Sequence, residues 1–271
     1  MISIIIPTIG RANTFLKALE SATACDSTCV DEILIADNSQ STEFAKLLET
    51  HNKLDQRINI IKYDERVNMA TSWNIATSKI KNDWVIYLHD DDLLYSKNIN
   101  IAAKYISPGI GFIYCDFDMD NNGKAAKWRY HDDDNLSNIL TFCPRFVSTI
   151  INKHSLLSVG GWNEKNGYAL DFVAFLLMAK NYSVIHGNCV LGLYRIHASN
   201  FSSRELRNKE YGDALGYVIN LLFIEYKDEK TRRKILTLLI DFIYPFPNKI
   251  INRIFQKLQR TINYPIKKQA F

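Results

Sequence analysis

Short apolar runs alternate with amphipathic segments through the first hundred residues. A continuous apolar run predicts a buried strand, whereas apolar positions repeated every three or four residues predict a helix. The predicted strands cover residues 3–6, 32–36, 58–63 and 84–88. The predicted helices cover residues 13–24, 42–50 and 68–80, the first of them capped by Asn13 or Thr14. Strands that alternate with helices indicate an α/β fold with a parallel, doubly wound sheet.

The pattern changes from about residue 109. Strands are predicted at 112–117 and 126–130, joined by a hairpin turn at Asn122-Gly123. The following segments are predicted as a strand at 145–152, a helix end at 156–161, a helix at 170–180, one or two strands within 183–195, and mostly helix over 205–271. This half of the chain therefore predicts a mixed sheet followed by a helical extension.

Polar residues follow the predicted strands at three places. Thr8, Asp37 and the run Asp90-Asp91-Asp92 each come directly after an apolar strand. In doubly wound sheets, ligands bind beyond the carboxyl ends of the strands, so these residues should share one edge. Three adjacent carboxylates gain most from a divalent cation such as Mg²⁺ or Mn²⁺. The alternative is a solvated acidic turn.

Two other acidic segments resemble metal sites in composition only. His131 to Asp134 repeats the letters of His89 to Asp92 but follows no buried strand, so it is predicted as a solvated loop. Asp118 to Gly123 opens like a calcium-binding EF-hand loop, yet its twelfth position is Arg129, where a glutamate is needed. This segment is therefore predicted as a hairpin.

Composition and charge narrow the class of protein. With 47% hydrophobic and 23% charged residues among 271, the chain should bury a core. The five cysteines are scattered without a paired spacing, which favours reduced thiols in a cytoplasm. Residues 226–271 carry a net charge of +8 (11 basic, 3 acidic) and the rest −4 (22 basic, 26 acidic), from the totals of 33 and 29. This asymmetry argues against a nucleic-acid-binding body and for a tail that meets an anionic partner.

The tail contains one amphipathic helical pattern. Its two faces are the apolar Ile250, Ile251, Ile254, Phe255, Leu258 and Ile262, and the basic Lys249, Arg253, Lys257 and Arg260. Such a helix can dock on the domain or lie on an anionic membrane surface, and both alternatives stay open. No run approaches the roughly 18 apolar residues of a membrane span.

Several motifs, in order over residues 2–203, resemble glycosyltransferase family 2, whose members have the GT-A fold and use nucleotide-sugar donors. These motifs are Ser3 to Thr8 with Gly10-Arg11, Ile35 to Ser39, Asn68 to Asn74, Leu88 to Asp92, Gly160 to Glu164, Ala169 to Phe172 and Tyr194 to His197. The resemblance implies a GT-A domain at 1–203, with a nucleotide-binding half at 1–108 and an acceptor half at 109–203. Residues 204–271 would form the helical C-terminal extension.

The resemblance also implies a role for each matching position. The implied nucleotide-sugar-binding residues are Pro7, Thr8, Gly10, Arg11, Asp37, Asn68, Asn74, Asp90 and Asp91. The implied metal ligands are Asp91 and His197, the implied catalytic base is Asp171, and the implied acceptor-side residues are Trp162, Asn163 and Glu164. Three positions depart from the family's usual residues, namely His89 (usually Asp), Leu170 (usually Glu) and Trp73 (often Arg).

The function that the resemblance implies is an inverting glycosyl transfer from a UDP-sugar, dependent on Mn²⁺ or Mg²⁺. A lipid-linked saccharide acceptor in surface polysaccharide or O-antigen synthesis is implied with it. The chain would then be cytoplasmic, with the tail bringing it to the inner membrane face. Asp91 would hold the cation that neutralises the leaving diphosphate, and Asp171 would take the acceptor's proton.

Two alternative functions remain. A nucleotidyltransferase could use a similar sheet, but it needs a glycine-rich basic loop after the first strand, and Thr8-Ile9-Gly10-Arg11 is short and lacks lysine. A non-catalytic sugar-binding subunit is favoured by His89 and Trp73, whereas Asp91 and Asp171 argue against it. Hydrolysis of a donor in the presence of Mn²⁺ separates these functions.

Overall fold

The computed structural model describes residues 1–130, 135, 138–139, 143–197 and 227–229. Within them, one compact unit comprises residues 1–164 and 174–197, and residues 165–173 belong to a second unit. The predictions for residues 131–134, for the helical extension and for its amphipathic segment lie outside the described residues.

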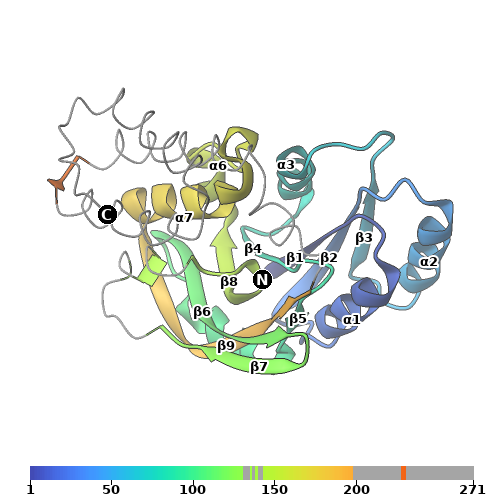
Figure 1. Cartoon of the computed structure of the whole chain (residues 1–271), viewed down its shortest axis with the longest axis horizontal. Coiled ribbons are helices and arrows are strands. Elements are labelled where there is room, and N and C mark those ends of the chain that lie inside the picture. The colour runs from blue at the N-terminus through green and yellow to red at the C-terminus, as the bar shows by residue number, and fades with distance from the viewer. Residues whose placement is uncertain (131–134, 136–137, 140–142, 198–226, 230–271) are drawn as a thin grey trace, which may run out of the picture. The chain divides into compact units, whose positions relative to one another are not determined.

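A curled, mixed sheet forms the centre of the first unit (Figure 1). Within the described residues its strand order is β3-β2-β1-β4-β8-β6-β9-β5, with β7 paired to β6. Strands β1 to β4 are parallel, β8 runs antiparallel to both β4 and β6, and β9 is parallel to β6. The strands are β1 (Ile2–Thr8), β2 (Val30–Asp37), β3 (Ile58–Lys62), β4 (Trp84–Tyr87), β5 (Leu93–Leu94), β6 (Ile110–Asn121), β7 (Lys124–Trp128), β8 (Thr149–Asn152) and β9 (Ser183–Ile196).

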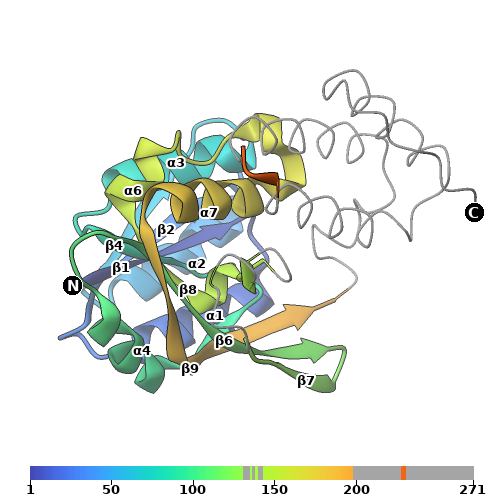
Figure 2. The same cartoon turned by 90° about the vertical axis from the view of Figure 1, so that its left-hand side faces the viewer.

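Helices cover both faces of the sheet, with α1 and α4 on one face and α3 and α6 on the other (Figure 2). The α-helices are α1 (Ala12–Thr23), α2 (Thr42–Asn52), α3 (Met69–Lys79), α4 (Ser96–Ala102), α6 (Lys153–Ser158) and α7 (Leu170–Asn181). Three 3₁₀ segments complete the described elements, η1 (Ala103–Tyr105), η2 (Phe146–Ser148) and η3 (Glu164–Ala169). None of the described helices is long and apolar enough to span a membrane.

The predicted strands and helices of the first ninety residues are confirmed with small changes in length. One detail is wrong, because α1 begins at Ala12, before both predicted capping residues. Thr14 therefore lies inside the first turn, where its hydroxyl donates to the Arg11 carbonyl at 3.1 Å. Arg11 occupies the cap position, and its guanidinium, which can only donate hydrogen bonds, makes its contacts elsewhere.

The second half shows larger differences from prediction. Residues 145–152 were predicted as one strand, but only β8 is extended. The Ser148 amide and hydroxyl donate to the Arg145 carbonyl at 2.8 and 2.9 Å, which closes a turn over η2. Residues 183–195 form a single strand, β9, in agreement with the predicted one or two strands, whereas β5 and α4 were not predicted. β5 is too short for a periodic signal.

The Asn122-Gly123 hairpin is confirmed, with β6 paired to β7 on either side of it. Both turn residues have positive φ, 50° and 84°, as a tight hairpin turn requires. Arg129 pairs with Asp118 at 2.8 Å, so the residue that interrupts the EF-hand pattern instead joins the ends of the hairpin. All five cysteines lie within the described residues, and none of them forms a disulfide bond.

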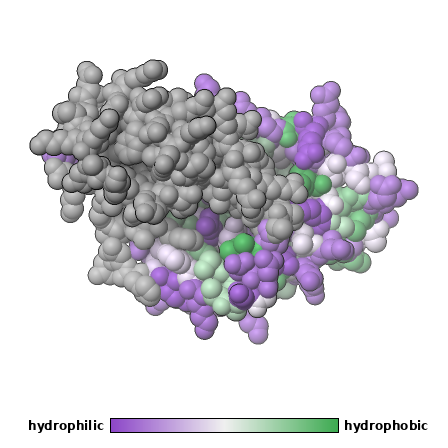
Figure 3. Space-filling view, viewed as in Figure 1, coloured by the Kyte–Doolittle hydropathy of each residue, from purple (hydrophilic) through white to green (hydrophobic). Residues whose placement is uncertain are grey.

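The core has a different composition on each face of the sheet. Aliphatic residues such as Ile4 and Ile86 pack with Phe15 of α1. On the other face, neighbouring ring centroids in an aromatic cluster lie 4.8–5.9 Å apart. This aromatic cluster consists of Trp73, Tyr87, His89, Phe146 and Trp162. On the face seen in Figure 3, the described surface is largely hydrophilic. This is expected, because most of the large apolar side chains are buried in the two core layers.

Gly192 of β9 fixes the position of β5, the strand that directly follows Asp92. A Cβ at Gly192 would lie 2.5 Å from Val147 Cγ2 and 2.6 Å from the Leu93 carbonyl oxygen. We expect Gly192→Ala to lower the free energy of unfolding by about 1–3 kcal/mol, because neither the buried Val147 of η2 nor the backbone of β5 can move aside cheaply. Urea unfolding of the variant measures this. Ala125→Ser on the exposed strand β7 is the control, and equal stability of Gly192→Ala and wild type would contradict the close contact.

Candidate functional site

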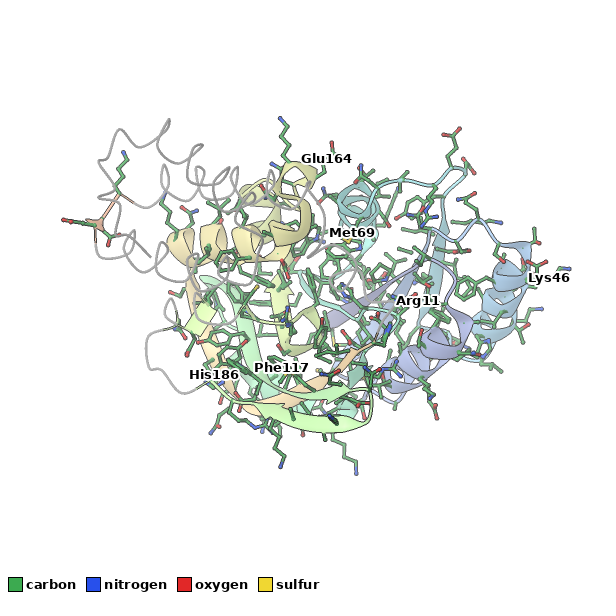
Figure 4. All side chains as sticks on the ribbon, viewed as in Figure 1. Arg11, Lys46, Met69, Phe117, Glu164 and His186 are labelled. Atoms are coloured by element: carbon green, nitrogen blue, oxygen red, sulfur yellow. The ribbon has the colours of Figure 1, made fainter. Side chains whose placement is uncertain are left out.

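The loop after β1 brings together three predicted nucleotide-binding residues, Thr8, Gly10 and Arg11. Gly10 has φ +89°, and a Cβ there would lie 2.7 Å from Ser39 Cβ, so the close approach to the loop after β2 requires glycine. The Gly10 amide donates to Thr8 Oγ1 at 3.0 Å. Arg11 lies at the start of α1 (Figure 4). The turn is therefore tight and fixed, with the arginine side chain at its end.

Asp90 links this turn to the loop after β4. Thr8 Oγ1 donates to Asp90 Oδ2 at 2.7 Å, and Arg11 Nη2 contacts the other oxygen of the same carboxylate. The parallel register accounts for the meeting, since the Leu88 amide donates to the Ile5 carbonyl at 2.9 Å and carries β4 to the level of β1. The structure thus places Thr8, Arg11 and Asp90 together at the carboxyl edge of the sheet, as predicted.

Asp91 faces both Arg11 and His197. Its Oδ2 lies 2.8 Å from Arg11 Nη1 and 3.2 Å from His197 Nε2. The two implied metal ligands, far apart in sequence, therefore meet in space. β9 brings His197 there because its residue Leu193 pairs with Leu93 of β5, directly after the acidic run.

Asp92, the third carboxylate of the predicted acidic run, is bound by Arg195, to which the sequence assigned no role. The Arg195 amide donates to Asp92 Oδ1 at 3.0 Å, and its Nε donates to the Asp91 carbonyl. Arg195 therefore fixes the backbone of the acidic loop as well as one carboxylate. The sequence signal for Arg195 was its place in the Tyr194 to His197 motif, at the end of β9 and two residues before the predicted metal ligand.

Three side chains of the acidic loop have the donor set of a metal site. His89, Asp91 and Asp92 each offer a ligand atom, and these atoms lie within 4.8 Å of one another. Burial lowers the pKa of His89, which keeps the imidazole in its neutral, metal-binding form. His89 Nε2 is buried and has no hydrogen-bond partner within the described part of the chain. Nitrogen and carboxylate ligands together suit Mn²⁺ better than Mg²⁺.

The raised pKa of Asp92 shows that its negative charge is destabilised at this site in the absence of a cation. Burial raises the pKa of Asp92 well above its ordinary value, and the charge of Asp91 raises it further. A divalent cation among these carboxylates offsets both effects by neutralising the buried charge. The residues present therefore fit a divalent metal.

Asp37 is buried at the end of β2 and has one unused oxygen. Its Oδ1 accepts from the Ser39 amide at 2.9 Å, whereas Oδ2 has no hydrogen-bond partner among the described residues. In the parallel register Asp37 pairs with Thr8, and Pro7 pairs with Ala36. A buried carboxylate oxygen without a donor is costly, so this atom suits a ligand N–H or O–H.

The predicted nucleotide-binding asparagines of α3 contact the predicted acceptor-side residues. Asn74 Nδ2 donates to the Trp162 carbonyl at 2.8 Å, and the Trp162 amide donates back to Asn74 Oδ1 at 2.9 Å. Asn68 caps α3 and donates to Glu164 Oε2 at 2.6 Å, near Met69 (Figure 4). The asparagines therefore join the Gly160 to Glu164 segment to α3.

Trp162 and Asn163, which were predicted on the acceptor side, differ in their burial. Trp162 is buried and its Nε1 donates to Tyr87 Oη at 2.8 Å, while Asn163 is exposed. Trp73, where the family often has arginine, is a core residue of the aromatic cluster. A tryptophan carries no positive charge, whereas the Arg11 guanidinium lies at the acidic loop.

Asp171 lies in the first turn of α7, within the second unit. Its Oδ1 accepts from the Phe172 amide at 2.8 Å. An acidic residue at a helix start is stabilised by the helix dipole. Its role as the catalytic base stays a prediction.

Comparisons with known proteins agree with this geometry. The model of a family described as Glycosyl transferase family 2 matches residues 3–159, more than half of the chain. An uncharacterized glycosyltransferase of Rickettsia typhi is 22% identical over 232 residues, covering 79% of this chain and 70% of that protein. An uncharacterized glycosyltransferase of Haemophilus influenzae is 27% identical over 116 residues, covering 42% and 38%.

Solved structures show the same fold at low identity. S. aureus TarS in complex with UDP-GlcNAc matches with a TM-score of 0.75 and 12% identity, covering 97% of this chain and 80% of that one. The mannosyltransferase PcManGT from Pyrobaculum calidifontis, in complex with GDP-Man and Mn²⁺, matches with a TM-score of 0.67 and 13% identity, covering 96% and 74%. The resemblance seen in the motifs is confirmed. The chain belongs to glycosyl transferase family 2 and is a glycosyltransferase with the GT-A fold.

Proposed function

We propose that the chain transfers a sugar from a UDP-sugar to a saccharide acceptor by a metal-dependent, inverting reaction. The observation that carries the proposal is that Arg11 and His197 both contact one carboxylate oxygen of Asp91. The hydrogen-bonded pair Thr8 and Asp90 lies beside them. Such a site offers ligands for a cation and a guanidinium for a diphosphate. Structural neighbours bound to UDP-GlcNAc and to GDP-Man with Mn²⁺ support a nucleotide-sugar donor.

The donor's nucleotide would lie along the carboxyl edge of β1, β2 and β4. The unused oxygen of Asp37 would accept an N–H or O–H of the nucleoside, and Thr8 and Pro7 would line the same edge. Asp91 and His197 would hold a divalent cation, with His89 and Asp92 within reach of it. When bound, the cation supplies charge neutralisation for the departing diphosphate. Arg11 would add a second positive charge there.

Asp171 would take the proton of the acceptor hydroxyl as that oxygen attacks the anomeric carbon. A single displacement of this kind inverts the anomeric configuration, because the acceptor enters opposite the leaving diphosphate. The reaction then passes through no covalent intermediate. The segment around Trp162, Asn163 and Glu164 would bind the acceptor. Holding both reactants in line lowers the barrier further.

The test is product analysis with candidate donors and Mn²⁺. We expect release of UDP from a UDP-sugar, slowly to water and faster when a saccharide acceptor is present. Release of pyrophosphate from a nucleoside triphosphate would instead indicate a nucleotidyltransferase. No turnover of any donor, with tight sugar binding, would indicate a non-catalytic subunit.

The acceptor is proposed to be a lipid-linked saccharide of surface polysaccharide or O-antigen synthesis, at the inner face of the cytoplasmic membrane. The support is the sequence of the tail, in which helical spacing would separate the basic Lys249, Arg253, Lys257 and Arg260 from the apolar positions. Each basic residue near an anionic surface contributes about 1 kcal/mol, so the attraction should be sensitive to salt.

Charge reversal in the full chain tests the membrane proposal. We expect wild type to sediment with anionic vesicles at low salt, and the pair Arg253→Glu with Lys257→Glu to lose most of that binding. The control reverses Lys46 and Lys79, two lysines of the first unit, in the same way. Equal sedimentation of the tail variant and wild type would contradict membrane binding by this face.

A further inference from the structure

One guanidinium spans two buried carboxylates at the candidate site. Arg11 Nη1 lies 2.8 Å from Asp91 Oδ2, and Nη2 contacts Asp90 Oδ1. The Asp90 and Asp91 side chains are only 2% and 7% exposed, whereas that of Arg11 is 29% exposed. Arg11 therefore neutralises buried negative charge from the solvent side, and its own position depends on these two partners.

The carboxylate oxygen that faces His197 is the same one that Arg11 occupies. Asp91 Oδ2 is 3.2 Å from His197 Nε2 and 2.8 Å from Arg11 Nη1. A cation held between Asp91 and His197 would thus lie within a few ångströms of the guanidinium. Two positive charges that close repel strongly where water is largely excluded. The guanidinium and a divalent cation therefore compete for Asp91.

Arg11 has the means to leave Asp91. Its side chain is partly exposed, and its Nε has no hydrogen-bond partner among the described residues. It stands at the cap position of α1, directly after the φ +89° turn of Gly10. A diphosphate is the partner that a planar guanidinium binds best, through two parallel hydrogen bonds.

We propose that Arg11 is a stand-in cation, which holds Asp91 while the donor is absent and moves to the donor's diphosphate when the metal enters. This inference rests on the proposed function of the same site. The movement of Arg11 makes metal and nucleotide bind cooperatively, because each ligand breaks the Arg11–Asp91 ion pair that hinders binding of the other. The metal gains Asp91 once Arg11 leaves, and the diphosphate gains Arg11 once the metal replaces it. By linkage, the gain in Mn²⁺ affinity from UDP equals the gain in UDP affinity from Mn²⁺.

Mn²⁺ binding to the full chain, followed by the electron paramagnetic resonance signal of free Mn²⁺, tests this without turnover. Without UDP, we expect Arg11→Gln to bind Mn²⁺ about tenfold more tightly than wild type, because the competing cation is gone. UDP should then strengthen Mn²⁺ binding much more in wild type than in the variant. Arg11→Lys, which keeps the charge but cannot span two carboxylates, should lie between them.

Two controls separate competition at Asp91 from other effects. Lys81→Gln removes the same charge from a surface pair with Asp31 and should leave Mn²⁺ affinity unchanged. Asp91→Asn should weaken Mn²⁺ binding in both the wild-type and Arg11→Gln backgrounds. Thermal unfolding followed by circular dichroism confirms that each variant is folded.

The outcomes for this inference and for the proposed function are distinct. Mn²⁺ binding by Arg11→Gln and Arg11→Lys that equals or falls below that of wild type, without UDP, overturns the stand-in cation and leaves the proposed function intact. Tighter Mn²⁺ binding by Arg11→Gln with an unchanged effect of UDP overturns the movement of Arg11 to the diphosphate. If no nucleotide or nucleotide sugar binds to any form, with or without Mn²⁺, the proposed function fails and the inference about the diphosphate fails with it.

Discussion

Replacing Asp91 by Asn is expected to reduce sugar transfer by about a thousandfold, since a bound cation supplies several kcal/mol of charge stabilisation at the leaving group. The side chain lies on a loop at the end of a strand, so the fold should be unaffected. Initial rates at saturating donor and Mn²⁺ measure the loss, and a melting curve checks the fold. The change removes the charge that faces both Arg11 and His197.

The matched control for Asp91→Asn is Asp133→Asn, in the second copy of the same four letters. That copy does not follow a buried strand, so its variant should retain nearly full activity. Comparable losses at the two positions would contradict the argument that the end of β4 creates the metal site. An unchanged rate for Asp91→Asn would contradict the assignment of that residue.

Replacing Asp171 by Asn is expected to reduce transfer by about 10²–10⁴-fold while leaving UDP affinity unchanged. The amide preserves the size of the side chain and its place in the first turn of α7 but cannot accept a proton from the acceptor. Transfer rates and UDP titration on the same preparation measure both quantities. A fall in UDP affinity that matches the fall in turnover would move Asp171 to the donor side.

The configuration of the product is a separate check on the same step. A single displacement assisted by Asp171 gives the anomer opposite to that of the donor. Proton coupling constants of the new glycosidic linkage report the configuration directly. Retention would contradict the single displacement, whichever residue acts as the base.

The edge of the sheet was predictable because it depends on local signals. An apolar run followed by Thr8, Asp37 or Asp90 locates a strand and its end, and parallel pairing then brings the ends together. The parallel register of β1 and β4 brings Thr8 and Asp90 to the same level, where their side chains meet at 2.7 Å. The order of the family motifs predicted that His197 lies near Asp91, which no local sequence pattern indicates.

The contacts that were not predicted depend on pairing between distant segments. Arg195 reaches Asp92 because the two-residue strand β5 pairs with β9, and so short a strand has no periodicity to detect. The reciprocal bonds between Asn74 and Trp162 arise where α3 meets a glycine-rich turn, and both residue types are common elsewhere. Side-chain partners of this kind follow from tertiary packing, which sequence patterns do not encode locally.

The aromatic cluster also explains two departures from the family pattern. Trp73 and His89 pack against Phe146 with ring centroids 5.0 and 4.8 Å apart. Trp73 serves the core, whereas His89 contacts the core and also lies within reach of Asp91 and Asp92. A substitution that looks like decay of a motif can therefore still offer a ligand atom at the same place, here a nitrogen instead of a carboxylate oxygen.

The central claim is that a divalent metal and a UDP-sugar bind together at the Asp91 site. Titration calorimetry of wild type and Asp91→Asn with a panel of UDP- and GDP-sugars, with and without Mn²⁺, tests it most directly. We predict that at least one UDP-sugar binds to wild type, that Mn²⁺ strengthens this binding, and that the strengthening is lost in Asp91→Asn. Binding of no nucleotide sugar, or binding that is indifferent to Mn²⁺ in wild type, would contradict the claim.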